Sequence, residues 1–170
     1  MRLKGWLGAG LSFGLILLAA GCSPHAATAG SAAPAVSGAA SAAVHPVSGL
    51  AVIPLSVTAS GSVHRFRVEI ARSDAEQEKG LMFRTVMGVD EGMIFPMQPP
   101  RSAAFWMKNT VIPLDIIFIG SDHRILNIAA KAVPYDETPL PSAGAAAGVL
   151  ELNGGRAAEL GIGPGDTVEW

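Results

Sequence analysis

The fold depends most on residues 105–119, which read FWMKNTVIPLDIIFI. Two apolar segments enclose a polar one, and a single carboxylate lies inside the second apolar segment. Side chains alternate between the two faces of a strand, so Asp115 shares a face with Ile117 and Ile119. A carboxylate on such a face costs free energy unless it is hydrogen-bonded. We therefore expect Asp115 to be ionised and to accept hydrogen bonds from the polar segment around Asn109 and Thr110.

Short alternating segments on both sides of this stretch predict further strands. In residues 64–70, Phe66, Val68 and Ile70 are expected to face a core, whereas Glu69 faces water. The pattern predicts strands near residues 52–59, 64–70, 93–95, 114–119, 124–132, 148–152 and 167–170, and short helices near 73–79 and 154–160. This predicts an all-β fold, a compact β-sandwich or a partly open barrel of seven or eight short strands with two short helices.

Prolines set the expected limits of two segments. Pro96 is expected to stop the strand at residues 93–95, because proline cannot donate to a strand ladder. Residues 134–147 carry three prolines and a run of small residues. We expect a long surface loop there.

The first 21 residues have the features of an export signal. Arg2 and Lys4 precede an uncharged, mostly apolar segment, residues 7–20, which is short for a membrane span. Small residues then lead to Cys22, the only cysteine, in an arrangement that resembles the lipobox of bacterial lipoproteins, with Ala19 where that motif usually has leucine. An ordinary signal peptide with an incidental cysteine is the alternative.

The lipobox resemblance implies that Cys22 is acylated and becomes the new N-terminus. The protein would then be a lipid-anchored, periplasm-facing component of the bacterial cell envelope. Ser23, rather than aspartate, follows the cysteine. By the sorting rule of that family, this favours the outer membrane.

Residues 22–50 are rich in Ala, Ser, Gly and Pro, with almost no charge, and predict a flexible tether. Two histidines, His25 and His45, fall in it, and we expect both to be exposed to solvent rather than to bind metal. Residues 51–170 are expected to form a single globular β-domain.

The charge balance and the motif content exclude several classes of protein. The chain has 14 acidic and 12 basic residues and a formal net charge of −2, whereas a nucleic-acid-binding domain is expected to carry a basic surface. It has no phosphate-binding glycine loop and no dinucleotide fingerprint. We expect no cofactor, no metal and no nucleic-acid partner, and beyond the membrane the expected partner is a small molecule or another protein.

Six short motifs, in this order and spacing, resemble one known family. They are VEIA at 68–71, GLMFR at 80–84, EGMIF at 91–95, FWMKNT at 105–110, PLD at 113–115 and VLELNGG at 149–155. The chain from Glu69 to Trp170 thereby resembles the family called domain of unknown function 192. The resemblance implies a compact β-sandwich fold, and because the family has no assigned reaction, it carries over no catalytic residue.

Two carboxylates, Asp115 and Glu151, are expected to be partly buried in strands. A carboxylate pair can act as acid and base, so a hydrolase is one hypothesis. The alternative is structural, with each carboxylate held by Lys108, Arg84 or backbone N–H groups.

A ligand site is a second hypothesis for the polar segment. Tryptophan stacks on sugars or apolar rings, while amide and ammonium groups orient polar ones. The candidate ligand-binding residues are Arg84, Trp106, Lys108, Asn109 and Thr110. The alternative is a structural turn whose tryptophan fills the core.

The methionines raise a third hypothesis, because a thioether is a soft ligand for copper(I). The five in question are Met82, Met87, Met93, Met97 and Met107. Their neighbours are mostly aromatic or aliphatic, which favours gap-filling in a core. We therefore expect a binding or accessory module of the envelope, with a hydrolase as the alternative and methionine-based copper binding as a lesser one.

Overall fold

The computed structural model describes residues 43–170. The predicted export signal, Cys22 and most of the predicted tether lie outside these residues. The described residues form mostly strands with two short helices, which confirms the predicted all-β class.

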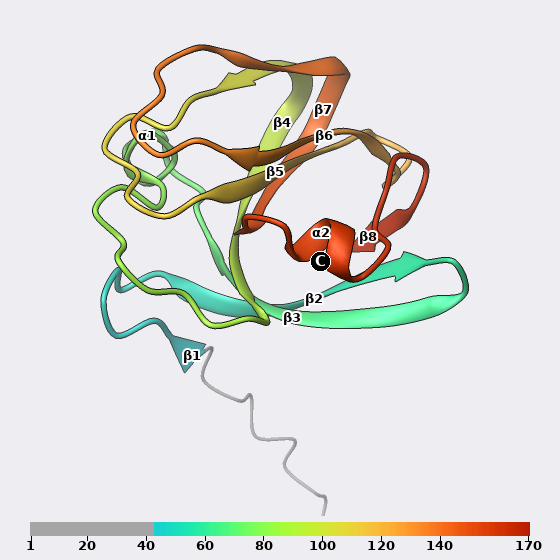
Figure 1. Cartoon of the computed structure of the whole chain (residues 1–170), viewed down its shortest axis with the longest axis horizontal. Coiled ribbons are helices and arrows are strands. Elements are labelled where there is room, and N and C mark those ends of the chain that lie inside the picture. The colour runs from blue at the N-terminus through green and yellow to red at the C-terminus, as the bar shows by residue number, and fades with distance from the viewer. Residues whose placement is uncertain (1–42) are drawn as a thin grey trace, which may run out of the picture. The chain divides into compact units, whose positions relative to one another are not determined.

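Eight strands form one curled sheet in the shape of a half-barrel (Figure 1). Their bounds are β1 Ala43–Val44, β2 Ala51–Ala59, β3 Ser62–Ile70, β4 Glu91–Phe105, β5 Leu114–Ile119, β6 Ile125–Ala132, β7 Leu140–Asn153 and β8 Thr167–Glu169. The strand order is β1-β2-β3-β4-β7-β5-β6. The pairing is antiparallel except between β3 and β4.

Strand β8 draws the two ends of this sheet together. It pairs with β2, and an isolated bridge joins its Thr167 to Arg124, just before β6. The backbone N–H of Ile125 also donates to the Asp166 carbonyl at 2.9 Å. The partly open barrel, one of the two predicted architectures, therefore describes the sheet better than a sandwich.

The sheet carries an apolar core on each of its faces. The inner core lies inside the curl and includes Phe66, Val68, Ile117 and Leu152. The outer core lies on the opposite face of β4, β5 and β7, under the loops that follow α1 and β4, and is formed by Ala71, Leu81, Met87, Met93, Phe95, Met97, Met107, Leu114, Ile116, Phe118, Ala132 and Val149. Strand β5 serves both cores, which is why all six of its residues are buried.

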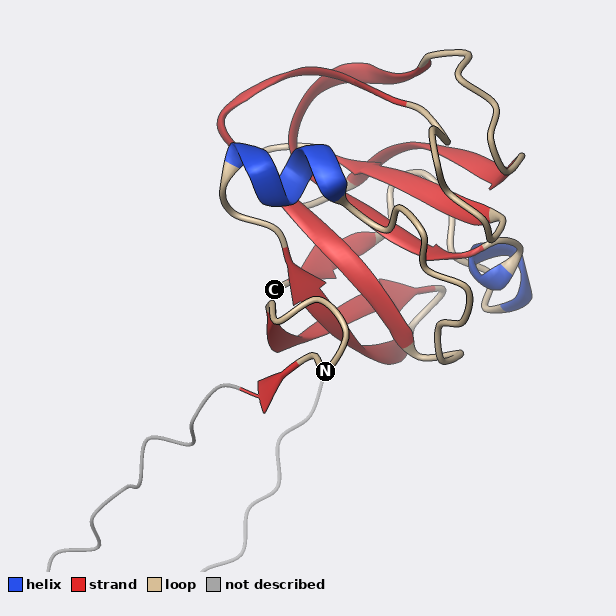
Figure 2. Cartoon of the chain, turned by 90° about the vertical axis from the view of Figure 1, so that its left-hand side faces the viewer, coloured by secondary structure: helices blue, strands red, loops and turns tan. Residues whose placement is uncertain are grey.

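Two short helices lie at different ends of the sheet (Figure 2). Helix α1, Asp74–Lys79, begins with the predicted capping box, in which Ser73 and Glu76 each bind the other's backbone N–H, and ends at Gly80 with a positive φ of 47°. Helix α2, Arg156–Glu159, is shorter than expected. Among residues 43–170 no helix is long and apolar enough to cross a membrane.

Two expectations based on proline are wrong. Strand β4 continues through Pro96 to Phe105. Pro96 pairs with Gly148 of β7, but its carbonyl points away from β7 and accepts from Gln77. On that side β3 pairs with β4 only as far as Ile94, so no strand needs a donor from the proline. The predicted loop at 134–147 is mostly strand, since β7 begins at Leu140 and follows β4.

The end of the predicted tether is also folded. Ala43 and Val44 pair with β2, and the Ser48 hydroxyl donates a hydrogen bond to the Glu69 carboxylate. His45 is not exposed filler, because its Nε2 lies 3.6 Å from the same carboxylate and its side chain is only 16% exposed. The globular domain therefore begins about eight residues earlier than predicted.

Candidate functional site

Asp115 is completely buried and hydrogen-bonded, as predicted, but by other partners. Its Oδ1 accepts from the backbone N–H groups of Lys131 and Gly155, and its Oδ2 from that of Ala157, each at 2.8 Å. The expected donors around Asn109 and Thr110 do not hydrogen-bond to it. The three donors come from the end of β6 and the start of α2, so Asp115 joins these two elements to β5 and has a structural role.

The predicted pair of Asp115 and Glu151 does not form. In the β5–β7 ladder Asp115 lies opposite Leu152, and Glu151 lies opposite Ile116. Directly paired residues point to the same face and consecutive ones to opposite faces, so the two carboxyl groups lie on different sides of the sheet. Asp115 faces the inner core with Leu152, and Glu151 faces the outer core with Ile116. The carboxylate-pair hydrolase therefore has no geometric basis.

Glu151 is a buried carboxyl group inside the outer core. It is 5% exposed, and burial raises its pKa from 4.5 to about 8. Burial is the only cause of this shift, so within residues 43–170 neither a cation nor a hydrogen bond stabilises the charged form. The group is therefore protonated at neutral pH. The structural alternative, in which Lys108 or Arg84 holds Glu151, is wrong.

Strand β4 can approach the backbone of Glu151 closely because it has a glycine at position 92. Gly92 of β4 pairs with Leu152, and a Cβ at Gly92 would collide with the Glu151 carbonyl oxygen. The EGMIF motif therefore lets β4 lie flat against the part of β7 that carries the buried carboxyl group.

Glu151 lines a pocket of about 150 Å³, which we call the Glu151 pocket. Helix α1 and the turn after it form one side, and the end of β4 with the polar segment after it forms another. The lining residues are Gln77, Glu78, Lys79, Gly80, Leu81, Met82, Phe95, Ala104, Phe105, Trp106, Lys108, Thr110 and Glu151. Three of the five predicted ligand-binding residues, Trp106, Lys108 and Thr110, therefore line one cavity with Glu151.

The pocket combines an apolar wall with a polar rim. Phe95 and Phe105 pack edge to face, with ring centroids 5.1 Å apart. Trp106 does not fill the core, because it is 51% exposed. The Lys108 ammonium lies 5.5 Å from the centroid of the indole ring, a cation–π contact that helps to hold the ring.

The other two predicted ligand residues have structural contacts instead. Arg84 is buried and forms a two-pronged ion pair with Glu69, at 2.8 and 3.0 Å. Glu69 therefore does not face water, contrary to the strand pattern. Asn109 adopts a positive φ of 54°, and its carbonyl accepts from the backbone N–H of Phe83 at 2.8 Å, which fixes the loop after α1.

The methionines follow the gap-filling alternative. Met87, Met93, Met97 and Met107 all belong to the outer core, where they pack with aromatic and aliphatic side chains. Met82 lies on the edge of the Glu151 pocket, and the Asn109 amide is 3.8 Å from its sulfur.

Several residues of the pocket were not predicted from the sequence. Gly80, Leu81, Phe95 and Phe105 line the cavity but were not among the predicted ligand-binding residues. All four lie in motifs that carry the family resemblance, as do Trp106, Lys108, Thr110 and Glu151. Membership in these motifs was the feature of the sequence that could have identified them as residues of one site.

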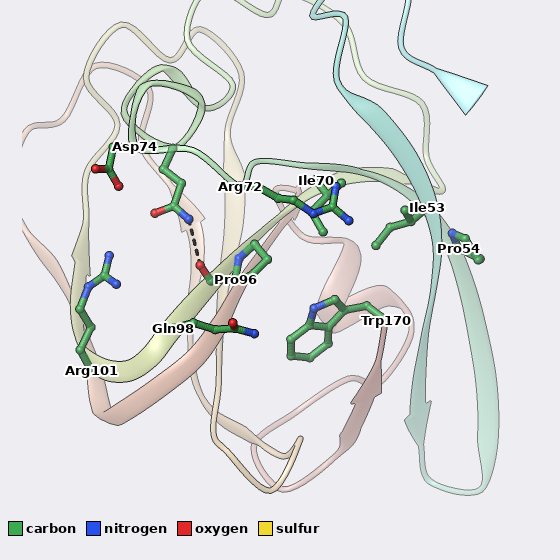
Figure 3. Close-up of a pocket in the computed structure, with 10 residues that line it drawn as sticks. Ile53, Pro54, Ile70, Arg72, Asp74, Pro96, Gln98, Arg101 and Trp170 are labelled. Atoms are coloured by element: carbon green, nitrogen blue, oxygen red, sulfur yellow. Dashed lines mark hydrogen bonds between the residues drawn. The ribbon is translucent and has the colours of Figure 1, made fainter. Parts of the chain in front are cut away.

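A second, larger pocket lies beside it, on the other side of Pro96. It measures about 640 Å³ and is lined by Ile53, Pro54, Ile70, Arg72, Asp74, Gln77, Pro96, Gln98, Arg101 and Trp170 (Figure 3). Gln77 donates to the Pro96 carbonyl at 2.9 Å and so braces α1 against β4. The charged side chains that line this second pocket are exposed. Unlike the Glu151 pocket, the second pocket is lined by no buried carboxyl group.

Two solved structures are similar to this chain. A protein of unknown function from Novosphingobium aromaticivorans is 66% identical, with a TM-score of 0.75 over 78% of this chain and 94% of that one. A protein described as a proposed transcription regulator from Sinorhizobium meliloti is 40% identical, with a TM-score of 0.69 over 71% of this chain and 94% of that one. No curated protein matches significantly.

The family comparison agrees with the motifs. The model of domain of unknown function 192, described as an uncharacterised ACR, matches residues 55–170. This range contains all the strands from β3 to β8 and every residue that lines the Glu151 pocket. The chain therefore belongs to the family of domain of unknown function 192.

Proposed function

We propose that this protein is a binding module that takes a small polar group into the Glu151 pocket. One observation carries the proposal, namely a carboxyl group that is 5% exposed, has a pKa raised to about 8 by burial alone and lines a cavity. Among residues 43–170 no hydrogen-bond partner stabilises the Glu151 carboxylate, and Glu151 lines a cavity that a ligand can enter. A small polar ligand in this cavity can therefore hydrogen-bond to Glu151.

Binding is favoured over hydrolysis because of the positions of the two carboxyl groups. Asp115 is committed to three backbone N–H groups on the opposite face of the sheet. Glu78 lines the pocket but is exposed on α1. A binding function requires only the single neutral carboxyl group, whereas the hydrolytic pair requires a partner that Asp115 does not provide.

The test uses small probes and two matched variants. Acetamide, acetone, acetate and methylammonium are titrated into the ¹⁵N-labelled protein, and backbone amide shifts are followed. We expect at least one probe to shift the amides of Gly80, Phe105 and Glu151. Ala104→Trp, at an exposed position that lines the pocket, is expected to abolish these shifts, because the indole fills the cavity.

Ala145→Trp is the matched control, since Ala145 is exposed on neighbouring β7 and lines neither pocket. It is expected to keep the wild-type response. If none of the probes shifts the pocket amides, or if the shifts persist in Ala104→Trp, the proposed binding function is wrong.

We further propose that the module is attached to the cell envelope by a lipid on Cys22, facing the periplasm. The support is the basic start, the apolar segment and the single cysteine after small residues. Cys22→Ala is expected to move the protein from the membrane fraction to the soluble one. Unchanged fractionation, together with an N-terminal peptide that carries no lipid in mass spectrometry, would contradict this.

A further inference from the structure

Building on the proposed binding function, we infer that the Glu151 pocket accepts the acetamido group of an N-acetylated amino sugar. The Glu151 O–H donates to the amide carbonyl, the aromatic wall contacts the methyl group, and Trp106 stacks on the sugar ring outside.

The hydrogen-bonding capacity of Glu151 selects an amide. The protonated carboxyl group has an O–H donor that a neutral acceptor inside the pocket can use. The C=O and N–H of a trans secondary amide point in opposite directions, so Glu151 contacts one of them, and its O–H donates to the acetamido carbonyl. A cationic ligand fits less well, because the environment stabilises the neutral form of Glu151 and offers no compensation for its charge.

The size of the pocket selects a small group. Its volume of about 150 Å³ is below the roughly 300–1,000 Å³ typical of sites that enclose a whole drug-sized ligand. The cavity therefore takes one substituent of a ligand and leaves the rest outside. Phe95, Phe105 and Leu81 supply apolar surface suited to a methyl group.

The rim of the pocket selects a sugar. Trp106 is half-exposed and lines the pocket, so its ring is accessible to a ligand. The Lys108 ammonium lies against the ring and helps to fix its orientation, so that the indole offers a preorganised platform. A pyranose ring attached to a buried acetamido group would lie at this rim, where its C–H face can pack on the indole.

The experiment compares four ligands on the intact protein by titration calorimetry or amide shifts. N-acetylglucosamine carries both features, glucosamine and glucose lack the acetamido group, and N-acetylglycinamide carries an amide without a sugar. N-acetylglucosamine is expected to bind at the Glu151 pocket with an affinity at least about tenfold above that of the other three.

The variants separate the two contacts. Glu151→Ala is expected to abolish binding, whereas Glu151→Gln, whose amide also has one carbonyl and N–H donors, is expected to retain it. Trp106→Ala is expected to lower the affinity for N-acetylglucosamine by about three- to tenfold and to leave the affinity for acetamide unchanged. Gln98→Ala, in the second pocket, is the matched control and is expected to bind like wild type.

The pH profile provides a readout that a structural role alone would not change. Wild-type affinity should fall above about pH 8, where Glu151 ionises and loses its donor, whereas the Gln variant should show no such fall.

Three results would overturn the inference. If glucosamine or N-acetylglycinamide binds as well as N-acetylglucosamine, the specificity for an acetylated sugar is wrong. If wild-type affinity rises above pH 8, the ionised carboxylate is the binding form. If acetone, acetate or methylammonium occupies the pocket while acetamide and N-acetylglucosamine do not, the binding function stands and the acetamido assignment falls.

Discussion

Asp115→Ala will lower the free energy of unfolding by about 3 kcal/mol or more, the largest effect expected for a single substitution in this domain. The change leaves three backbone N–H groups, those of Lys131, Gly155 and Ala157, without their acceptor. The site is buried at Ala157 and partly buried at Lys131 and Gly155. Each unsatisfied buried donor costs roughly 1–3 kcal/mol. Because small domains have only about 5–15 kcal/mol of stability, the variant is expected to be close to unfolding.

Chemical denaturation with urea measures this effect, and Asp115→Asn is the matched variant. Asparagine keeps one carbonyl oxygen, which can still accept from one or two of the three N–H groups. Its NH₂ group is a donor and cannot accept from the others. The Asn variant should therefore be destabilised, but less than the Ala variant. The expected order of stability is wild type, then Asn, then Ala. If both variants were as stable as wild type or more so, Asp115 would be held for function rather than for structure.

The second large effect is a fall in stability with rising pH that depends on Glu151. Its pKa is raised from 4.5 to about 8, so between these pH values the folded state keeps a proton that the unfolded state releases. The unfolded state therefore binds fewer protons, and the free energy of unfolding falls as pH rises, by up to about 1.4 kcal/mol per pH unit. The contribution is fully present below about pH 4.5 and lost above about pH 8.

Glu151→Gln isolates this term, because glutamine has nearly the same shape and does not titrate. Urea denaturation of both proteins from pH 5 to pH 9 gives the difference in unfolding free energy at each pH. We expect the wild type to lose stability relative to the Glu151→Gln variant as the pH rises from 5 to about 8. A difference that stays constant with pH would mean that Glu151 is not buried in its neutral form.

The regular strands could be predicted because their side chains alternate in burial. Residues 64–68 show this alternation, whereas residues 114–119 form an apolar segment that is buried on both faces. The capping box at Ser73 indicated the start of α1. The first half of β7 has small residues of low strand propensity, so only its pairing with β4 makes it a strand. The strand was wrongly expected to end at Pro96, because only the tertiary structure shows at which positions a strand needs no N–H donor.

Individual residues of the site could be predicted from the sequence, but not which of them lie close together. The sequence indicates which residues of one strand share a face, and Glu151 is indeed on the face of Val149. It does not contain the register between strands, and that register separates Asp115 from Glu151. The three donors to Asp115 lie 16 to 42 residues away along the chain, so no local pattern could identify them.

The way in which β8 joins the sheet also bears on how the domain folds. Thr58 pairs with Thr167, and nearly the whole domain lies between them along the chain. Contacts of such long sequence separation carry the largest loop-closure entropy and are favoured only after the intervening chain is ordered. The β5–β6 hairpin has far shorter separations. We therefore expect β8 to dock late, so that substitutions at Val168 speed unfolding and leave the folding rate nearly unchanged.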